Sequence, residues 1–336
     1  MIKTMRKKVL ISHKIPDKPL KKLEEDFELI WPDSVAFSRE EMLAIIPSCD
    51  VVIGVFGNPL DTELIKAGVR LKLIANYGAG VDNIDVETAT KAGIVVTNTP
   101  DAVTEPTAEL AMGLIVDVAR RISEFDRALR KKLIDDWGVL SNWGTSLNGK
   151  TLGIIGMGAI GKALARRALA FGMKIIYHNR NKSDPAVEER FEAKYTDLEN
   201  LLRNSDFVSL NVPLTSETKG MISSSELKLM KPDAFLINTS RGAVVRQDAL
   251  IEALAKREIA GAALDVFDNE PEVPDALLKM PNVVVVPHIG SATTEARNEM
   301  SRHLAEIITD FFQGMKGLPV VNPEVWGSKN LRISKI

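Results

Sequence analysis

The chain has 336 residues and a formal net charge of −2, and 45% of its residues are hydrophobic and 26% charged. This composition is typical of a globular protein, and the near-neutral charge gives no reason to expect nucleic acid or a membrane surface as a partner. A single cysteine, Cys49, excludes an intramolecular disulfide and a cysteine-based zinc site, and we expect no metal. The apolar stretch near the start is too short for a signal peptide, and no run approaches membrane-spanning length, so the cytoplasm is the expected location.

The first third of the chain alternates short apolar runs with helical patterns. We predict strands at 8–12, 27–31, 50–55, 71–75 and 93–97, and helices at 39–46, 61–67 and 86–92. A long helical pattern follows, from Thr104 to about Leu133. Alternation of strands and helices indicates a parallel sheet.

Residues 152–161 form an apolar run that enters the glycine turn Gly156-Met157-Gly158-Ala159-Ile160-Gly161, and a helical pattern continues from Lys162 to Phe171. A GxGxxG turn between a strand and a helix lets backbone N–H groups approach a pyrophosphate, and the helix N-terminus favours the same anion. The turn therefore predicts dinucleotide binding, with an ordinary strand–helix turn as the alternative.

The remaining elements continue the alternation. We predict strands at 174–178, 206–212, 234–238, 260–264 and 283–287, and helices at 196–204, 247–256 and 291–313. Because the glycine turn lies in mid-chain, we expect two Rossmann-like, doubly wound α/β domains with the active-site cleft between them. The substrate domain would be residues 1–98 plus 291–336, and the dinucleotide-binding domain residues 99–290.

The strand after the glycine turn indicates which dinucleotide is preferred. It ends in Asn179-Arg180-Asn181-Lys182, where an NAD-binding domain usually carries an acidic residue for the ribose hydroxyls. Loss of the acid removes repulsion against a 2′-phosphate, and Arg180 adds attraction. We therefore predict a preference for NADP(H) over NAD(H); the alternative is a solvated turn with Asp184 reaching back to the ribose.

Three polar residues follow three predicted strands behind the glycine turn: Arg241, Glu270 and His288. Ligands of open α/β sheets bind outside the carboxyl ends of the strands, so these side chains are expected to converge. Arginine can grip the carboxylate of a 2-keto acid and polarise its carbonyl, and histidine is the best proton donor near neutral pH. A nearby carboxylate favours the imidazolium and fixes the ring. Each residue alone is more often structural, and only the set indicates catalysis.

These motifs resemble those of the D-isomer-specific 2-hydroxyacid dehydrogenases over nearly the whole chain. The resemblance is specific at 156–161, 238–242, 263–271 and 287–293, and residues 76–85 are similar to the glyoxylate/hydroxypyruvate and 2-ketogluconate reductases. It implies an Arg241–Glu270–His288 catalytic set that reduces small 2-keto acids to D-2-hydroxy acids. It also implies that the substrate is bound by Ala79, Gly80, Arg241 and His288. The implied cofactor-binding residues are Thr107, Gly156, Gly158, Ala159, Ile160, Gly161, Asn179, Arg180, Asn181, Thr239, Ser240, Asp265 and Gly290.

The same resemblance implies a homodimer that pairs through the cofactor domain, with the loop that contains Trp137 and Trp143 at the interface. Whether either tryptophan enters the partner's active site stays open. Two alternatives also remain. One is an NAD-linked member of the family, of the D-lactate, formate or phosphoglycerate type. The other is a dinucleotide-sensing protein similar to the corepressors that resemble this family.

Overall fold

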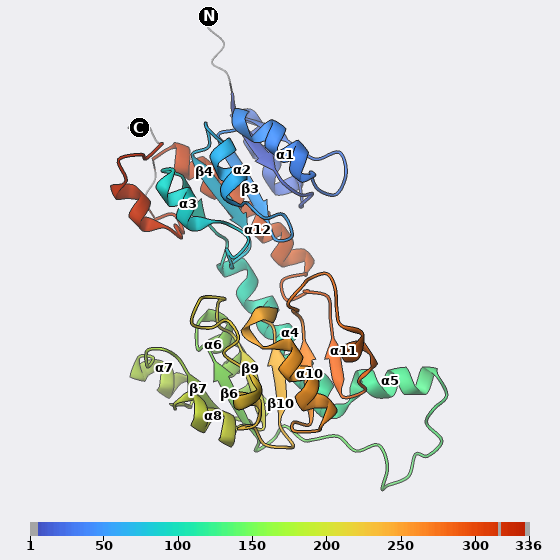
Figure 1. Ribbon diagram of the computed structural model, residues 1–336. Helices are drawn as coiled ribbons and strands as arrows, with labels where there is room; N and C mark the ends of the chain where they lie inside the picture. The colour runs from blue at the N-terminus through green and yellow to red at the C-terminus, as the bar shows by residue number, and fades with distance from the viewer. Residues whose placement is uncertain (1–5, 315–316, 333–336) are drawn as a thin grey trace, which may run out of the picture. The chain divides into compact units, whose positions relative to one another are not determined.

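The computed structural model describes residues 6–314 and 317–332. The chain divides into two compact units, which are drawn in Figure 1. Unit 1 is Met1–Val103 with Thr293–Ile336, and unit 2 is Thr104–Ala292. Each unit contains its own parallel sheet.

The sheet of unit 1 has the strand order β2-β1-β3-β4-β5, and every pairing is parallel. Its strands are β1 (Lys7–Ile11), β2 (Phe27–Ile30), β3 (Val51–Val55), β4 (Leu73–Tyr77) and β5 (Val95–Thr97). The helices of this unit are η1 (Lys18–Glu25), α1 (Arg39–Ile45), η2 (Ile46–Ser48), α2 (Thr62–Ala67), α3 (Val86–Lys91), α12 (Thr294–Phe312) and η4 (Pro323–Gly327).

Both faces of this sheet are covered, because successive side chains along a strand point to opposite sides. Val9 and Ile11 of β1 pack in a cluster with η1 and α12, whereas Leu10 between them packs in a cluster with α1, α2 and α3. All three are fully buried. Strands buried on both faces explain the nearly continuous apolar runs of the sequence.

The sheet of unit 2 has the order β12-β11-β10-β9-β6-β7-β8 and is also parallel throughout. Its strands are β6 (Thr151–Ile155), β7 (Lys174–His178), β8 (Ala193–Tyr195), β9 (Phe207–Leu210), β10 (Phe235–Asn238), β11 (Gly261–Leu264) and β12 (Val283–Val285). The helices are α4 (Asp101–Arg120), α5 (Ile122–Arg130), α6 (Ala159–Ala170), α7 (Pro185–Arg190), α8 (Leu198–Asn204), α9 (Ser224–Leu227), η3 (Gly242–Val244), α10 (Gln247–Ala255) and α11 (Asp275–Lys279).

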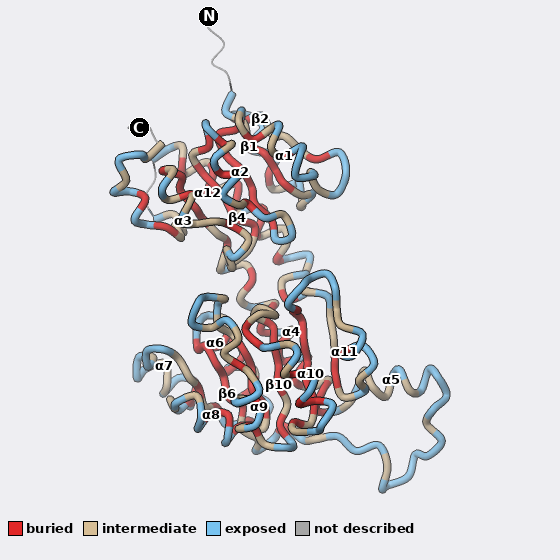
Figure 2. Tube along the Cα trace, in the orientation of Figure 1, coloured by how far each residue is buried: buried red, intermediate tan, exposed pale blue. Residues whose placement is uncertain are grey.

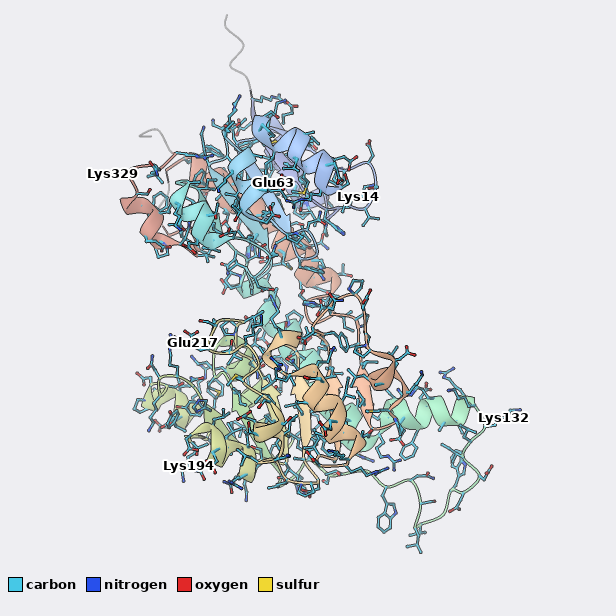
Figure 3. All side chains as sticks on the ribbon, in the orientation of Figure 1. Lys14, Glu63, Lys132, Lys194, Glu217 and Lys329 are labelled. Atoms are coloured by element: carbon cyan, nitrogen blue, oxygen red, sulfur yellow. The ribbon has the colours of Figure 1, made fainter. Side chains whose placement is uncertain are left out.

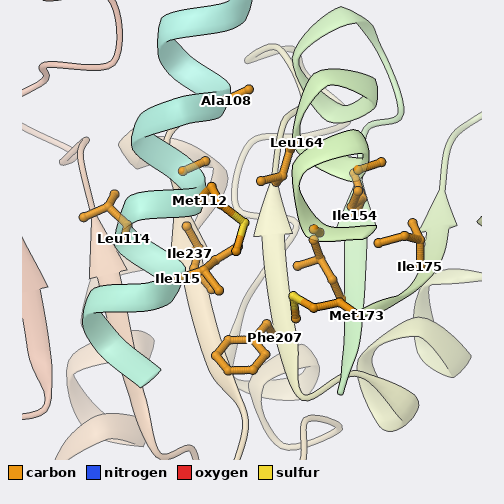
Figure 4. Packing of buried hydrophobic residues seen from close by; sticks show 14 of the residues in the cluster. Ala108, Met112, Leu114, Ile115, Ile154, Leu164, Met173, Ile175, Phe207 and Ile237 are labelled. Carbon is orange, nitrogen blue, oxygen red and sulfur yellow. The ribbon is translucent and has the colours of Figure 1, made fainter. Parts of the chain in front are cut away.

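Helices cover both faces of this sheet as well. Met112 and Ile115 of α4 and Leu164 of α6 pack on one face, against Ile154 and Phe207 (Figure 4). On the other face, α8, α9, α10 and α11 contribute a second cluster. Figure 2 shows the result, with buried strands in red and pale blue segments at the surface of each unit.

The predicted helix from Thr104 to Leu133 is wrong in its length and continuity. Two helices, α4 and α5, replace it, and Arg121 between them has a left-handed backbone with φ of 56°. The turn is held by Asp117, whose carboxylate accepts hydrogen bonds from the backbone N–H (2.7 Å) and hydroxyl (2.5 Å) of Ser123. Strand β8 was also not predicted.

The strand order places a site in unit 2. From β6 the chain moves outward through β7 and β8, then returns to form β9 on the other side of β6. In such sheets, ligands bind at the carboxyl ends of the strands beside the reversal, which here are β6 and β9. None of the helices in the described ranges is long and apolar enough to cross a lipid bilayer.

Candidate active site

The glycine turn follows β6 at this reversal, and its three glycines differ in backbone conformation and in the space beside them. Gly156 has φ of +100°, and a Cβ there would lie 2.6 Å from the carbonyl oxygen of Asn211. A Cβ on Gly161 would lie 2.3 Å from the carbonyl oxygen of Gly156, so α6 packs closely on the turn. Gly158 has open space beside it. This pattern fits a turn that brings its backbone close to a pyrophosphate.

Helix α6 begins directly after Gly158, so the first-turn amides of Ala159, Ile160 and Gly161 face its N-terminal end. These amides and the helix dipole form an anion-binding end. The Met157 amide before them donates to Oδ1 of Asn179 at 2.7 Å, which ties the glycine turn to the end of β7.

The segment after β7 carries the residues that we expect to select the cofactor. Arg180 and Asn181 are exposed. The pKa of Glu217 is lowered mainly by a hydrogen bond with Thr215, and the charge of Arg180 contributes to the same shift. Figure 3 labels Glu217 in unit 2. Asp184 instead caps α7, because its Oδ1 accepts a hydrogen bond from the Ala186 amide at 2.8 Å. The carboxylate considered for the ribose hydroxyls is therefore engaged elsewhere.

Arg241 follows β10, in a loop held by Asn238. The side-chain amide of Asn238 donates to the Arg241 carbonyl at 2.9 Å, and Oδ1 of Asn238 accepts from the Ser240 amide at 3.0 Å. Gly242 presses this loop onto the one after β11, since a Cβ on Gly242 would lie 2.0 Å from the carbonyl carbon of Phe267. The arginine and Glu270 loops thus pack backbone to backbone.

Glu270 and His288 form a direct pair. The imidazole Nδ1 lies 2.7 Å from Oε2 of Glu270, and the other carboxylate oxygen accepts from the Phe267 amide at 3.0 Å. Burial acts to raise the pKa of Glu270, but the hydrogen bond and charge of His288 outweigh it, with help from Phe267 and Arg241, and the pKa is lowered. The carboxylate therefore stays charged at neutral pH and orients the ring through Nδ1.

Asp265, at the end of β11, holds the turn that carries the histidine. Its carbonyl accepts from the His288 amide at 2.9 Å, and its carboxylate accepts from the amides of Ile289 (2.6 Å) and Gly290 (2.9 Å). His288 itself has φ of 50°, a left-handed conformation that needs such support. Burial raises the pKa of Asp265 to about 6, against the opposing effect of these amides and of His288.

Two other residues predicted to bind the cofactor, Thr107 and Gly290, lie beside Asp265. A Cβ on Gly290 would lie 3.1 Å from Oδ2 of Asp265 and 3.4 Å from the Thr107 side chain. Thr239 is buried, and among the described residues its hydroxyl has no hydrogen-bond partner. Such a hydroxyl costs free energy unless a ligand or water meets it, so it fits a group bound at this edge.

Asn211 is a residue that sequence reasoning missed. It follows β9, and its backbone lies against the glycine turn, since a Cβ on Gly156 would lie 2.6 Å from the Asn211 carbonyl oxygen. Its backbone N–H donates to the Ile155 carbonyl at 2.8 Å, and its side-chain amide donates to the Ser209 carbonyl at 3.2 Å. Its buried Oδ1 lacks a partner among the described residues. The predicted strand at 206–212 included Asn211, so nothing in the sequence marked it as a residue that follows β9.

In unit 1, Ala79 and Gly80 follow β4. The carbonyl of Gly78 accepts from the Thr99 amide (2.9 Å), that of Ala79 from the Asn98 side chain (2.7 Å) and that of Gly80 from the Asn76 side chain (2.7 Å). In a planar trans peptide the N–H points away from the carbonyl before it. The amides of Ala79 and Gly80 therefore point away from Thr99 and Asn98, respectively.

Comparison with known proteins decides the family. The model described as "D-isomer specific 2-hydroxyacid dehydrogenase, NAD binding domain" matches residues 112–290. The chain belongs to this family. As a D-2-hydroxyacid dehydrogenase it is an NAD(P)-dependent oxidoreductase, and its two parallel-sheet units have the fold predicted for it.

Other members of the family match along almost the whole chain. The glyoxylate reductase of Thermococcus litoralis is 49% identical over 326 residues, which cover 96% of this chain and 98% of the relative. Among solved structures, a glyoxylate reductase from Paecilomyes thermophila has a TM-score of 0.86 and 36% identity, covering 95% of this chain and 99% of the other. An NADPH-dependent glyoxylate/hydroxypyruvate reductase from Sinorhizobium meliloti, in complex with NADP and malonate, has a TM-score of 0.84 and 33% identity, covering 99% of both chains.

Proposed function

We propose that this dehydrogenase reduces small 2-keto acids, with glyoxylate and hydroxypyruvate first and 2-ketogluconate next, to D-2-hydroxy acids, and that it prefers NADPH. The observation that carries the proposal is the 2.7 Å contact between Nδ1 of His288 and the Glu270 carboxylate, on loops packed beside Arg241. The similarity to the two glyoxylate reductases described above supports the substrate class.

The residues present fit a nicotinamide dinucleotide. The glycine turn and the first amides of α6 would hold the pyrophosphate, and residues 179–181 the adenosine end. Thr107, Thr239, Ser240, Asp265 and Gly290 would lie toward the nicotinamide. When bound, the reduced cofactor supplies the hydride.

The protein's own residues then have distinct tasks. Arg241 binds the substrate carboxylate and polarises the carbonyl, with the amides of Ala79 and Gly80 as further carboxylate donors. With Nδ1 bonded to Glu270, His288 gives its Nε2 proton to the oxygen that becomes the hydroxyl. Glu270 keeps the ring oriented through its contact with Nδ1.

The preference for NADPH is argued from the end of β7. The exposed Arg180 offers a guanidinium fork to a 2′-phosphate, and Asp184 is used as the cap of α7. The Sinorhizobium neighbour described above is NADPH-dependent.

Steady-state kinetics test the proposal directly. We expect kcat/KM for NADPH with glyoxylate or hydroxypyruvate to exceed that for NADH. Arg180→Gln should lower kcat/KM for NADPH by about tenfold or more while leaving that for NADH unchanged. Lys194→Gln, an exposed cation on β8, is the matched control. A wild-type enzyme that favours NADH would refute the cofactor preference, and absence of turnover with every 2-keto acid would refute the activity.

We also propose a homodimer that pairs through the arm formed by α5 and residues 131–149. Leu133, Trp137, Val139 and Leu140 of the arm are 68–92% exposed. The loop after α5 is mostly pale blue in Figure 2, and Figure 3 labels Lys132 at the end of α5. A cluster of exposed apolar side chains of this size is typical of a protein interface.

A further inference from the structure

A cavity in unit 1 lies at the edge of the sheet opposite to Ala79 and Gly80. It has a volume of about 410 Å³ and is lined by Asp50, Val69, Arg70, Lys72 and Arg332. Asp50 directly precedes β3 and Lys72 directly precedes β4, whereas Ala79 and Gly80 follow β4. In a parallel sheet these are opposite edges, so the cavity is separate from the substrate residues proposed in this unit.

The charges around the cavity do not balance. Asp50 is buried, and its Oδ1 lies 3.3 Å from Nζ of Lys72 while its Oδ2 lies 3.5 Å from the Arg70 guanidinium. The Lys8 amide also donates to Oδ2, at 3.1 Å. Asp50 thus pairs with two cations, and Arg332 is a third cation in the lining, so the described lining residues carry one negative and three positive charges.

Arg332 is the least compensated of the three. Its Nη1 donates to the carbonyls of Gly68 (2.5 Å) and Leu71 (3.2 Å), which flank Arg70 in the same turn. Burial lowers the pKa of this guanidinium, and no carboxylate among the described residues contributes to the shift. A cation held partly out of water by neutral carbonyls is stabilised by an anion that reaches its remaining N–H groups.

We propose that this cavity binds a small phosphate-bearing anion, with Arg70, Lys72 and Arg332 as its ligands. A phosphate group carries close to two negative charges at neutral pH and so matches the uncompensated charge, whereas a monocarboxylate would match half of it. Asp50 anchors Arg70 and Lys72 at the cavity before any anion arrives, which lowers the entropic cost of binding. The volume suits a free phosphate or a small phosphomonoester.

Calorimetric titration of the full-length protein tests this site. Inorganic phosphate and glycerol phosphate are titrated separately, each with and without saturating NADPH. We expect one site per chain that NADPH does not abolish. Arg70→Gln and Arg332→Gln should each weaken binding by about tenfold or more, the worth of a charge-assisted contact. Arg39→Gln is the matched control, because Arg39 is a half-exposed arginine of the same unit, paired with Asp61 and Glu63.

Arg332→Gln also removes the hydrogen bonds between Arg332 and the 68–71 turn, so this variant should lose stability whether or not the cavity binds an anion. Arg70→Gln leaves those hydrogen bonds in place, so the test depends on this variant. Tighter binding of glycerol phosphate than of inorganic phosphate would identify a phosphomonoester, and equal binding would identify phosphate itself. Absence of binding at millimolar concentrations, equal affinity in Arg70→Gln and the wild type, or complete displacement by NADPH would overturn the proposal.

Discussion

Two carboxyl groups support His288, and their surroundings shift their pKa values in opposite directions. Glu270 has a lowered pKa because it is hydrogen-bonded to the imidazole, and Asp265 has a pKa raised to about 6 because it is buried. Glu270 orients the ring, while Asp265 fixes the backbone that carries it. Opposite shifts of neighbouring carboxyl groups are typical of catalytic sites, where each group has a separate task.

His288→Ala should lower kcat for reduction of glyoxylate by roughly 10²–10⁴-fold, because it removes the proposed proton donor. Glu270→Gln keeps a hydrogen-bond acceptor for Nδ1 but removes the carboxylate charge, so it should lower kcat less than His288→Ala does. Both variants are measured by kcat for glyoxylate with NADPH. A wild-type rate in His288→Ala would contradict the assignment.

At the scale of the elements, the loops after β10, β11 and β12 are positioned by close backbone packing. The strands are in register, with Asn238 beside Leu264 and Val285 also beside Leu264. Gly242 then brings the loop after β10 onto the backbone of Phe267. The register of the strands and the contact between Gly242 and Phe267 thus fix the positions of the proposed catalytic loops.

Gly242→Ala should displace the Arg241 or Glu270 loop, because no flexible side chain can move to admit the new Cβ. We expect a loss of kcat/KM of at least about tenfold, with a lower unfolding temperature. Gly113→Ala is the control, since Gly113 lies inside α4 with nothing within 4 Å of its Cβ position. Helix propensity predicts that this control is neutral or slightly stabilising. Normal kinetics in Gly242→Ala would show that the loops tolerate separation.

The arm formed by α5 and residues 131–149 is the proposed dimer interface. Val139→Asp with Leu140→Asp should convert a dimer into a monomer in analytical ultracentrifugation, because charges would have to be buried in an apolar interface. Val35→Asp, at an exposed apolar residue of unit 1, is the matched control and should leave the mass unchanged. A monomeric wild type would refute the proposed interface.

For the whole molecule, stability is expected to depend on pH through Asp265. A carboxyl group with a raised pKa binds its proton more tightly in the folded chain than in the unfolded chain, where the pKa is about 3.9. The free energy of unfolding therefore falls as the pH rises from about 4 to about 6, as the buried group becomes charged.

Asp265→Asn removes this titration. The stability of the wild type relative to this variant should decrease across that window, by on the order of 2–3 kcal/mol, and stay constant above neutral pH. Unfolding measured at several pH values tests this, with the exposed cap variant Asp184→Asn as the control. A difference that does not vary with pH would show that Asp265 does not titrate there.

The order of strands and helices was predictable from local patterns alone. Leu152, Ile154 and Ile155 form an apolar run that predicts β6, and Gly156 marks the turn that follows. Strand β8 was missed because Ala193-Lys194-Tyr195 is too short to give a period and lies at the sheet edge. The break at Arg121 was missed because arginine favours helices, and the Asp117–Ser123 contacts that stabilise the turn exist only once it forms.

By itself, the sequence determined the alternating α/β pattern, the glycine turn and the family motifs, since each depends on residues that are close together in the chain. Only the tertiary structure decided the contact between His288 and Glu270, the raised pKa of Asp265 and the cavity that joins Asp50 to Arg332. Hydrogen-bond distance and burial depend on which strand ends and loops meet after folding, and local sequence patterns do not specify these.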